Sequence, residues 1–238
     1  VSSACDTVMI FTDRLFLARL SSEAMSAAMG GGLTSFMMST FFIGLTGYGT
    51  ALTAQYLGAG RKNRCAVTLT QGLIISLLAY PLILLARPLA LGLFQALNIP
   101  PGQLAMQTAY FNILVYGALL GLIRNVLSGF FSGIGQTRWV MISSLATLLL
   151  NVLANYLLIY GKCGFPALGI AGAAYGTLFG GFCGLVILAA AYLTPANRRA
   201  FDLRHSLRLD PEVMRRLIRF GYPTGIEFFM NMLAFNLL

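Results

Sequence analysis

Charged residues are scarce in this 238-residue sequence, at 10% of the total, whereas hydrophobic residues account for 58% and glycine for a further 26 residues. Soluble domains carry about 25% charged and about 45–50% apolar residues, and disordered chains have few apolar residues and a high net charge. The mean hydropathy of +0.78 exceeds what either class shows. An ordinary soluble domain and a disordered chain are therefore excluded, and the composition predicts an all-α polytopic membrane protein.

Cysteine and histidine are also rare, and they lie far apart. No C-x-x-C pair occurs, so neither a disulfide framework nor a zinc site is indicated. The H-E-x-x-H, G-x-S-x-G and P-loop motifs are all missing as well. We therefore expect no enzymatic activity, no metal centre and no cofactor. The residues concerned are Cys5, Cys65, Cys163, Cys183 and the single histidine, His205, which we expect on the surface.

Long stretches without charge predict seven helices, because a membrane helix needs about 20 mostly apolar residues. The second helix is longer than a membrane is thick, and the glycines 30–32 could bend it. Residues 88–98 are expected to form a short re-entrant segment before the turn 98–102. The predicted helices are 1–17, 23–57, 66–86, 103–133, 139–160, 168–193 and one starting near 220.

The two ends of the sequence are abrupt. Val1 opens directly into apolar sequence without an initiator methionine, and Leu238 lies inside an apolar run. We therefore expect a fragment of a longer protein. Its expected parts are a six-helix transmembrane lobe at 1–194, a basic loop at 195–219, and the start of a seventh span at 220–238.

Basic residues are distributed unequally between alternate loops. One side has eleven, the other has Arg14, Arg19, Arg87 and Lys162, and Arg124 lies within a span. The positive-inside rule then places the eleven, and with them the N-terminus, in the cytoplasm. The net charge of +9 thus reflects orientation in a membrane rather than binding to nucleic acid. The eleven are Arg61, Lys62, Arg64, Arg138, Arg198, Arg199, Arg204, Arg208, Arg215, Arg216 and Arg219.

The last basic loop contains a helix signature of its own. Asp210 is a suitable N-cap and Pro211 suits the first helical position. Val213, Leu217 and Phe220 then recur at helical spacing, with arginines on the remaining positions. This pattern predicts an interfacial amphipathic helix lying on the membrane, and we assign no chemistry to its arginines.

Three carboxylates lie within predicted spans: Asp6, Asp13 and Glu227. An acidic side chain costs about 2.5–3.5 kcal/mol at the centre of a membrane helix, so each is a candidate functional residue. Asp13 could instead lie near a helix end and pair with Arg14 or Arg19, but we favour function. For Asp6 the two interpretations are balanced.

Other polar side chains at membrane depth form helical pairs. Asn151 and Asn155 are four residues apart in the fifth span, and Glu227 and Asn231 are four apart in the seventh. Such amides often only hydrogen-bond to a neighbouring helix. The small residues at 169–174 indicate close helix packing in the sixth span. Thr177, Tyr116 and Gln71 are further polar candidates, the last two weak ones.

The order of these features resembles the multidrug and toxic compound extrusion (MATE) family of secondary transporters, along essentially the whole sequence. Each similar segment is weak alone, but all of them occur in the family's order. The segments are FTDRLF at 11–16, AQYLGAGR at 54–61, QGL at 71–73, SGIGQTR at 132–138, N-x3-NY at 151–156, and GFPALGIAGAA at 164–174 followed by Thr177.

The resemblance implies twelve helices in two six-helix lobes, of which this sequence covers the N-terminal lobe and the start of the seventh helix. It also implies antiport at the cell inner membrane, in which a small cationic drug or metabolite leaves while Na⁺ or H⁺ enters. We expect the carrier to be a monomer surrounded by lipid. By position, the resemblance assigns Asp13, Asn151, Asn155 and Thr177 to an ion-coupling or proton-coupling site. Apart from the coupling ion, Na⁺ or H⁺, the resemblance implies no cofactor.

The sequence departs from the family's pattern at two places. Asn155 stands where one branch of the family has a second aspartate. Asn231 stands where many members have a glutamate, so either Glu227 substitutes for it or that second site is missing. Asp6 and Tyr116 remain candidates for substrate contact. Two other functions stay open: a flippase for lipid-linked polysaccharides, which would need many cationic residues in its cavity, and a scaffold that does not transport.

Overall fold

The computed structural model describes residues 2–97, 99–202 and 206–237, and in these ranges every regular element is an α-helix. This confirms the predicted fold class, while His205 lies outside the described residues. The helices are α1 (Ser2–Leu20), α2 (Ser22–Gly58), α3 (Lys62–Ala96), α4 (Pro101–Tyr116), α5 (Ala118–Gly133), α6 (Thr137–Tyr160), α7 (Ile170–Tyr192), α8 (Pro195–Ala200) and α10 (Pro211–Leu237).

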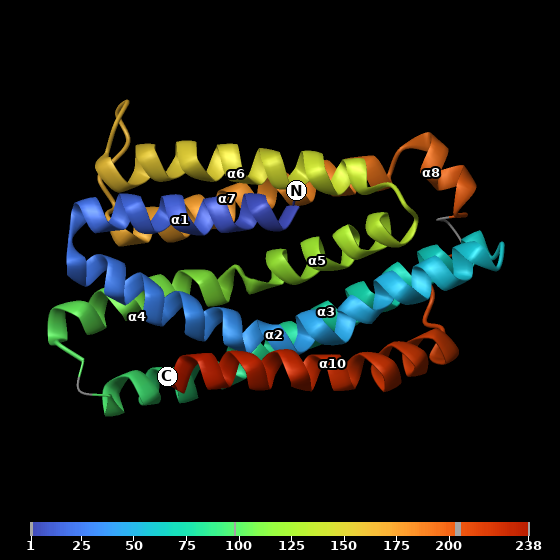
Figure 1. Cartoon of the computed structure of the whole chain (residues 1–238), viewed down its shortest axis with the longest axis horizontal. Helices are drawn as coiled ribbons and strands as arrows, with labels where there is room; N and C mark the ends of the chain where they lie inside the picture. The colour runs from blue at the N-terminus through green and yellow to red at the C-terminus, as the bar shows by residue number, and fades with distance from the viewer. Residues whose placement is uncertain (1, 98, 203–205, 238) are drawn as a thin grey trace.

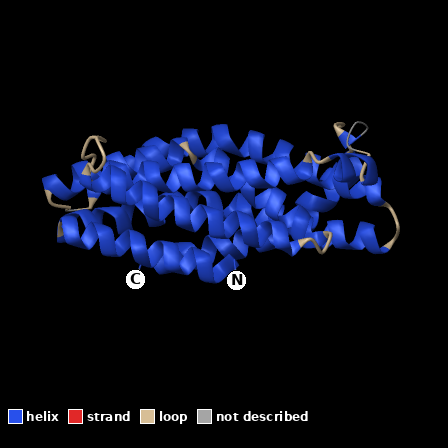
Figure 2. Ribbon diagram, turned by 90° about the horizontal axis from the view of Figure 1, so that it is seen from above, coloured by secondary structure: helices blue, strands red, loops and turns tan. Residues whose placement is uncertain are grey.

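The long helices run side by side, and their connections gather at the two ends of the bundle (Figures 1 and 2). Helices α1, α6 and α7 form one side, α2, α3 and α10 form the other, and α4 and α5 lie between them (Figure 1). The α2–α3 and α5–α6 turns and α8 share one end, which we call the basic end because most of the eleven basic residues lie in these connections and at the start of α10.

The lengths and composition of the helices match a membrane environment. Among the described residues, α2, α3, α6 and α7 are each long and apolar enough to cross a membrane. Helices α4 and α5 pass the same test as a pair, bent by 47° at Gly117. The chain is therefore a multi-pass membrane protein. The prediction of one continuous helix at 103–133 is therefore wrong. The chain bends at Gly117, where the absence of a side chain lets the backbone approach the side chain of Leu178 in α7.

Helix α3 is longer than the sequence suggests. It continues past Ala86 to Ala96 and includes Pro88, so the predicted re-entrant segment is wrong. The charge of Arg87 does not end the helix because its Nε donates to Asn112 Oδ1 at 2.8 Å and its guanidinium lies 5.2 Å from the ring centroid of Tyr116. A proline removes one backbone hydrogen bond, which membrane helices tolerate.

The glycines near the start of α2 serve packing. Helix α2 runs without interruption through residues 30–32. A Cβ atom on Gly31 would lie 2.9 Å from the backbone oxygen of Gln107, and one on Gly30 would lie 2.8 Å from Nε2 of the same residue. The missing side chains therefore allow α4 to lie directly against α2.

Helix α10 forms one unit from Pro211 to Leu237. Asp210 caps it, since its Oδ1 accepts hydrogen bonds from the backbone of Glu212 and Val213, each at 3.1 Å. Val213 and Leu217 are 0% exposed, in a core shared with α2, α3 and α5. Val213 and Leu217, which were predicted to lie on the membrane, thus pack on the protein because the bundle offers them a complementary apolar surface, whereas Phe220 of the same predicted face is 48% exposed. The part boundaries proposed at 195–219 and 220–238 remain predictions.

Helices α6 and α7 pack backbone to backbone, and a prediction follows at Gly172. A Cβ atom there would lie 2.6 Å from the backbone oxygen of Leu158, which cannot move without separating the helices. Gly172→Ala is expected to lower the free energy of unfolding by about 1–3 kcal/mol. The measurement is the thermal unfolding midpoint of the full-length protein in detergent. Gly181→Ala is the matched control, since its Cβ would meet nothing within 4 Å, and an equal loss in both variants would contradict the explanation.

Candidate functional site

Asp13 lies in α1 where this helix packs against α6 and α7. Leu17, one turn further along α1, is 1% exposed and belongs to a core cluster with Ile159 of α6 and Ala173 of α7. Residues four apart share a helix face, so the packing of Leu17 directs Asp13 towards the same neighbours. The half-buried carboxylate is thereby held between helices.

A chain of polar side chains continues from Asp13 across α6 to α7. Asn155 Nδ2 donates to Asp13 Oδ1 at 2.5 Å and to Asn151 Oδ1 at 3.3 Å. Asn151 Nδ2 donates in turn to Thr177 Oγ1 at 3.4 Å. Both asparagines are 0% exposed. The structure therefore brings together the four residues singled out in the sequence, from three different helices.

Two glycines of α7 make room for the asparagines. A Cβ atom on Gly176 would clash with Asn155 Oδ1, and one on Gly180 would lie 3.0 Å from Asn151 Cβ. The two glycines are four residues apart, as are the two asparagines, so one stripe of α7 faces one stripe of α6. The small residues predicted to allow close packing therefore continue further along α7 than the run 169–174.

Tyr110 of α4 also contributes to the polar cluster around Asp13, and it was not among the candidates predicted from the sequence. Its side chain is 7% exposed and lies close to Thr177 and Asp13. The only signal in the sequence was a tyrosine hydroxyl at membrane depth. That signal pointed equally to Tyr116, which is 55% exposed and lies under Arg87 instead.

The other candidates lie apart from this cluster. Glu227 and Asn231 are exposed on α10, which packs on α2 and α3 rather than on α1. Asp6 is half-buried on α1, seven residues before Asp13. Gln71 is 0% exposed, and its Nε2 donates to the backbone oxygen of Arg208 at 2.8 Å, which is a structural contact.

The cluster presents oxygen atoms suited to a hard cation or a proton. Among the described residues, Asn155 Oδ1 is buried and accepts no hydrogen bond, and it belongs to the residue that contacts the Asp13 carboxylate. Carboxylate, amide and hydroxyl oxygens are the ligands that hard cations prefer. No group of three or more His, Cys, Asp or Glu side chains that could hold a metal ion occurs in the part of the chain that the structure describes.

The fold and the cluster together define a class of protein: a polytopic helical membrane protein that keeps an acidic side chain among polar groups between its helices. Acidic residues in such positions are rare and characteristic of ion and proton pathways. Comparison with known sequences identifies the family. A model of the MatE family matches residues 1–157, and the chain belongs to this family.

Curated relatives carry corresponding names. The chain is 29% identical over 221 residues to the probable multidrug resistance protein NorM of Synechocystis, covering 91% of this chain and 47% of that protein. It is 32% identical over 219 residues to the Bradyrhizobium diazoefficiens protein of the same name, and the match covers 90% of this chain and 46% of that protein. The multidrug resistance protein NorM of Vibrio cholerae is 25% identical, with coverage of 99% and 52%. The chain thus spans about half the length of these relatives.

Solved structures share the fold. An inward-facing multidrug resistance MATE family transporter of the MOP superfamily superposes with a TM-score of 0.84 at 21% identity, covering 98% of this chain and 52% of that one. A MOP superfamily transporter from Pyrococcus furiosus gives 0.81 at 20% identity, with coverage of 94% and 49%. Coverage of about half of each chain is consistent with one lobe of a two-lobe architecture.

Proposed function

We propose that the full-length protein is a secondary active antiporter that exports organic cations or drugs in exchange for Na⁺ or H⁺. The observation that carries the proposal is the Asp13 carboxylate, held by Asn155 and surrounded by Asn151, Thr177 and Tyr110. Membership of the MatE family and the names of the NorM relatives support export of drug-like molecules. Small cationic substrates are the proposed cargo, and the carrier is proposed to act as a monomer.

The proposed coupling step takes place at Asp13. A Na⁺ ion would be bound by the carboxylate with the free oxygen of Asn155, whereas a proton would neutralise the carboxylate directly. Either event changes the charge that α1 presents to α6 and α7, and so changes the relative stability of two packing arrangements of these helices. A shift between such arrangements is what an alternating-access carrier needs.

The proposed orientation has the basic end in the cytoplasm. This end of the bundle holds most of the arginines and lysines, and the positive-inside rule relates such an excess to the cytoplasmic side. The N-terminus would then also be cytoplasmic, and the membrane would be the cell inner membrane. A second lobe of six helices is expected to complete a twelve-helix carrier.

The test is transport by the reconstituted full-length protein. Vesicles that carry the protein are given a fluorescent organic cation and an imposed Na⁺ gradient, a pH gradient, or neither. We expect movement of the cation against its own gradient only when one of the ion gradients is present, and the effective gradient identifies the coupling ion. Well-folded protein that moves no cation under either gradient would contradict the antiport proposal.

A further inference from the structure

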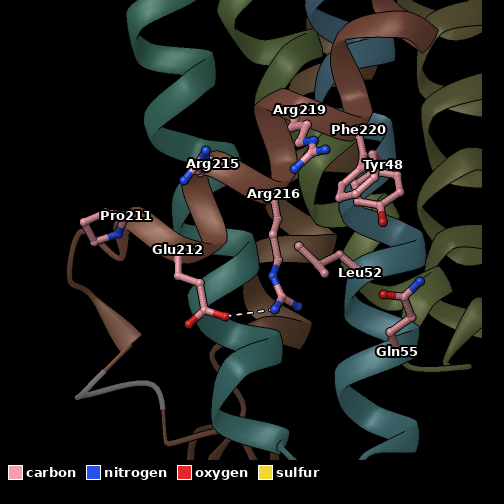
Figure 3. A pocket seen from close by; sticks show the side chains of 9 residues that line it. All are labelled: Tyr48, Leu52, Gln55, Pro211, Glu212, Arg215, Arg216, Arg219 and Phe220. Atoms are coloured by element: carbon pink, nitrogen blue, oxygen red, sulfur yellow. Dashed lines mark ion pairs between the residues drawn. The ribbon is translucent and has the colours of Figure 1, made fainter.

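A pocket opens at the basic end of the bundle, between α2 and the first turns of α10, and no step of the proposed transport uses it. Its volume is about 840 Å³. Figure 3 shows its side chains, which come from α2 and from the start of α10. We call it the arginine pocket, and the residues that line it are Tyr48, Leu52, Gln55, Pro211, Glu212, Arg215, Arg216, Arg219 and Phe220.

The arginine pocket has an excess of positive charge. Glu212 is the one acidic residue among those that line it, and two arginines already share its charge. Glu212 Oε1 lies 3.0 Å from Arg216 Nη2, and its Oε2 lies 3.3 Å from Arg64 Nη2. The structure shows no ion pair between Arg215 or Arg219 and the other residues that it describes. Two guanidinium groups therefore remain available to an anion.

The acidic groups in and near the pocket are held in place by ion pairs with arginines. Arg64, at the start of α3, also binds Asp210 Oδ2 at 3.0 Å, and Asp210 caps α10. These contacts anchor the first turn of α10 to the bundle. They also fix Glu212, which in turn orients Arg216 (Figure 3). The arginines of the pocket therefore lie on a helix whose first turn is fixed to α3 by ion pairs.

Part of the pocket wall, next to the charges, is aromatic and apolar. The rings of Tyr48 and Phe220 are stacked, with centroids 5.4 Å apart and an interplanar angle of 30°. Leu52 lies beside them and is 1% exposed. Arg219 lies over the Phe220 ring at 5.7 Å from its centroid. The pocket therefore combines cationic donors with an apolar wall, which suits a ligand that has a charged head and a hydrocarbon body.

The depth of the pocket matches the boundary of a membrane. Helix α2 has 37 residues, which at about 1.5 Å per residue is about 55 Å, so an upright and centred α2 would extend about 12 Å beyond each side of a ~30 Å hydrocarbon core. Tyr48 lies ten residues before the end of α2 at Gly58, or about 15 Å inward. The aromatic pair thus lies near the edge of the hydrocarbon, where such residues gather. In the same placement the arginines would lie at the level of the headgroups.

We propose that the arginine pocket binds the phosphate headgroup of an anionic phospholipid from the leaflet at the basic end. Arg215 and Arg219 would bind the phosphate oxygens, since guanidinium groups donate well-directed, charge-assisted hydrogen bonds to phosphate. The acyl chain would leave along the stacked rings. This site is separate from Asp13 and does not depend on which ion, if any, drives transport.

The experiment measures lipid binding to the full-length protein in detergent by native mass spectrometry. The probes are phosphatidylglycerol, phosphatidylcholine with the same acyl chains, and inorganic phosphate. We expect phosphatidylglycerol to bind with higher affinity than phosphatidylcholine, and inorganic phosphate not to displace it at matched concentration. The double variant Arg215→Gln with Arg219→Gln should weaken phosphatidylglycerol binding roughly tenfold or more, because it removes both guanidinium groups that would donate charge-assisted hydrogen bonds to the phosphate.

The matched control is Arg198→Gln with Arg199→Gln, which removes the same charge from exposed positions of α8 after α7, outside the pocket. It should leave the affinity unchanged, whereas Arg215→Lys with Arg219→Lys, which keeps the charge but loses the forked guanidinium donors, should weaken binding less than the double glutamine variant does. If the double glutamine variant does not fold, Arg215→Gln alone should show a smaller loss, because this exposed side chain makes no ion pair with the described residues. Equal affinity in pocket variant and wild type, an equal loss in the control, or displacement by inorganic phosphate would overturn the proposal.

Discussion

Replacing Asp13 with asparagine is expected to abolish gradient-driven transport by the full-length protein. The substitution keeps the size of the side chain and its ability to accept a hydrogen bond from Asn155, but it removes the negative charge. A proton could then no longer be bound at this position. A cation would lose the only carboxylate of the cluster, and losing one partner of a buried charge pair costs about 2–5 kcal/mol, so the rate should fall about a hundredfold or more.

The measurement compares cation uptake by vesicles that hold wild type, Asp13→Asn or Glu23→Gln, with the ion gradient imposed and without it. Glu23 lies exposed in the first turn of α2, so its variant makes the same chemical change outside the cluster. We expect Glu23→Gln to transport like wild type. Equal gradient-driven uptake by Asp13→Asn and wild type would refute a coupling function for Asp13 and would direct attention to Glu227 and to the other half of the carrier.

The second large effect is expected when Gly176 is replaced. This glycine packs against Asn155 but has no side chain that could take part in the polar cluster. An alanine Cβ there would clash with Asn155 Oδ1, the end of a side chain that can turn away. Turning the amide breaks its hydrogen bonds to Asp13 and Asn151. Gly176→Ala should therefore lower transport at least about tenfold, because a hydrogen bond to a charged group contributes about 1.5–3 kcal/mol.

The stability of Gly176→Ala should change much less than its transport. Alanine raises helix propensity by about 1 kcal/mol over glycine, which offsets part of the strain. Uptake assays and thermal unfolding of Gly176→Ala and Gly181→Ala separate the two effects, since a Cβ on Gly181 meets nothing within 4 Å. We expect Gly181→Ala to unfold near the wild-type temperature, Gly176→Ala to unfold a few degrees lower but as a folded protein, and only Gly176→Ala to lose transport. Full transport by a folded Gly176→Ala would show that the position of the Asn155 amide does not matter.

The pattern of the candidate site was partly visible in the sequence. The spacing of Asn151 and Asn155 placed both amides on one helix face, and the resemblance to MATE transporters added Asp13 and Thr177 to them. Tyr110 was missed, since nothing local distinguishes it from Tyr116. The difference is decided by the bend at Gly117, after which the chain continues as α5, and by the packing of α4 against α2 and α7.

Errors in the fold prediction have a common physical origin. Arg87 was placed in a loop because an isolated charge in a span is costly, but Asn112 and Tyr116 contact it within the bundle. Val213 and Leu217 were placed on the membrane because an amphipathic face needs an apolar surface, and the neighbouring helices supply one instead. In both cases the sequence correctly indicated that a charge needs polar or aromatic contacts, or that an apolar face needs an apolar surface. It did not show which neighbouring helix supplies them.

The sequence by itself determined the class of this protein: a bundle of membrane helices with most of its basic residues at one end, within the MATE family. Hydrophobicity and charge are properties of the local composition, so these conclusions need no knowledge of which helices touch. The tertiary structure alone decided that Asp13 contacts Asn155, 142 positions away, and that α10 and α2 enclose an arginine pocket. Such contacts depend on how helix surfaces fit together, because glycines and large side chains far apart in the chain must match before polar groups can meet.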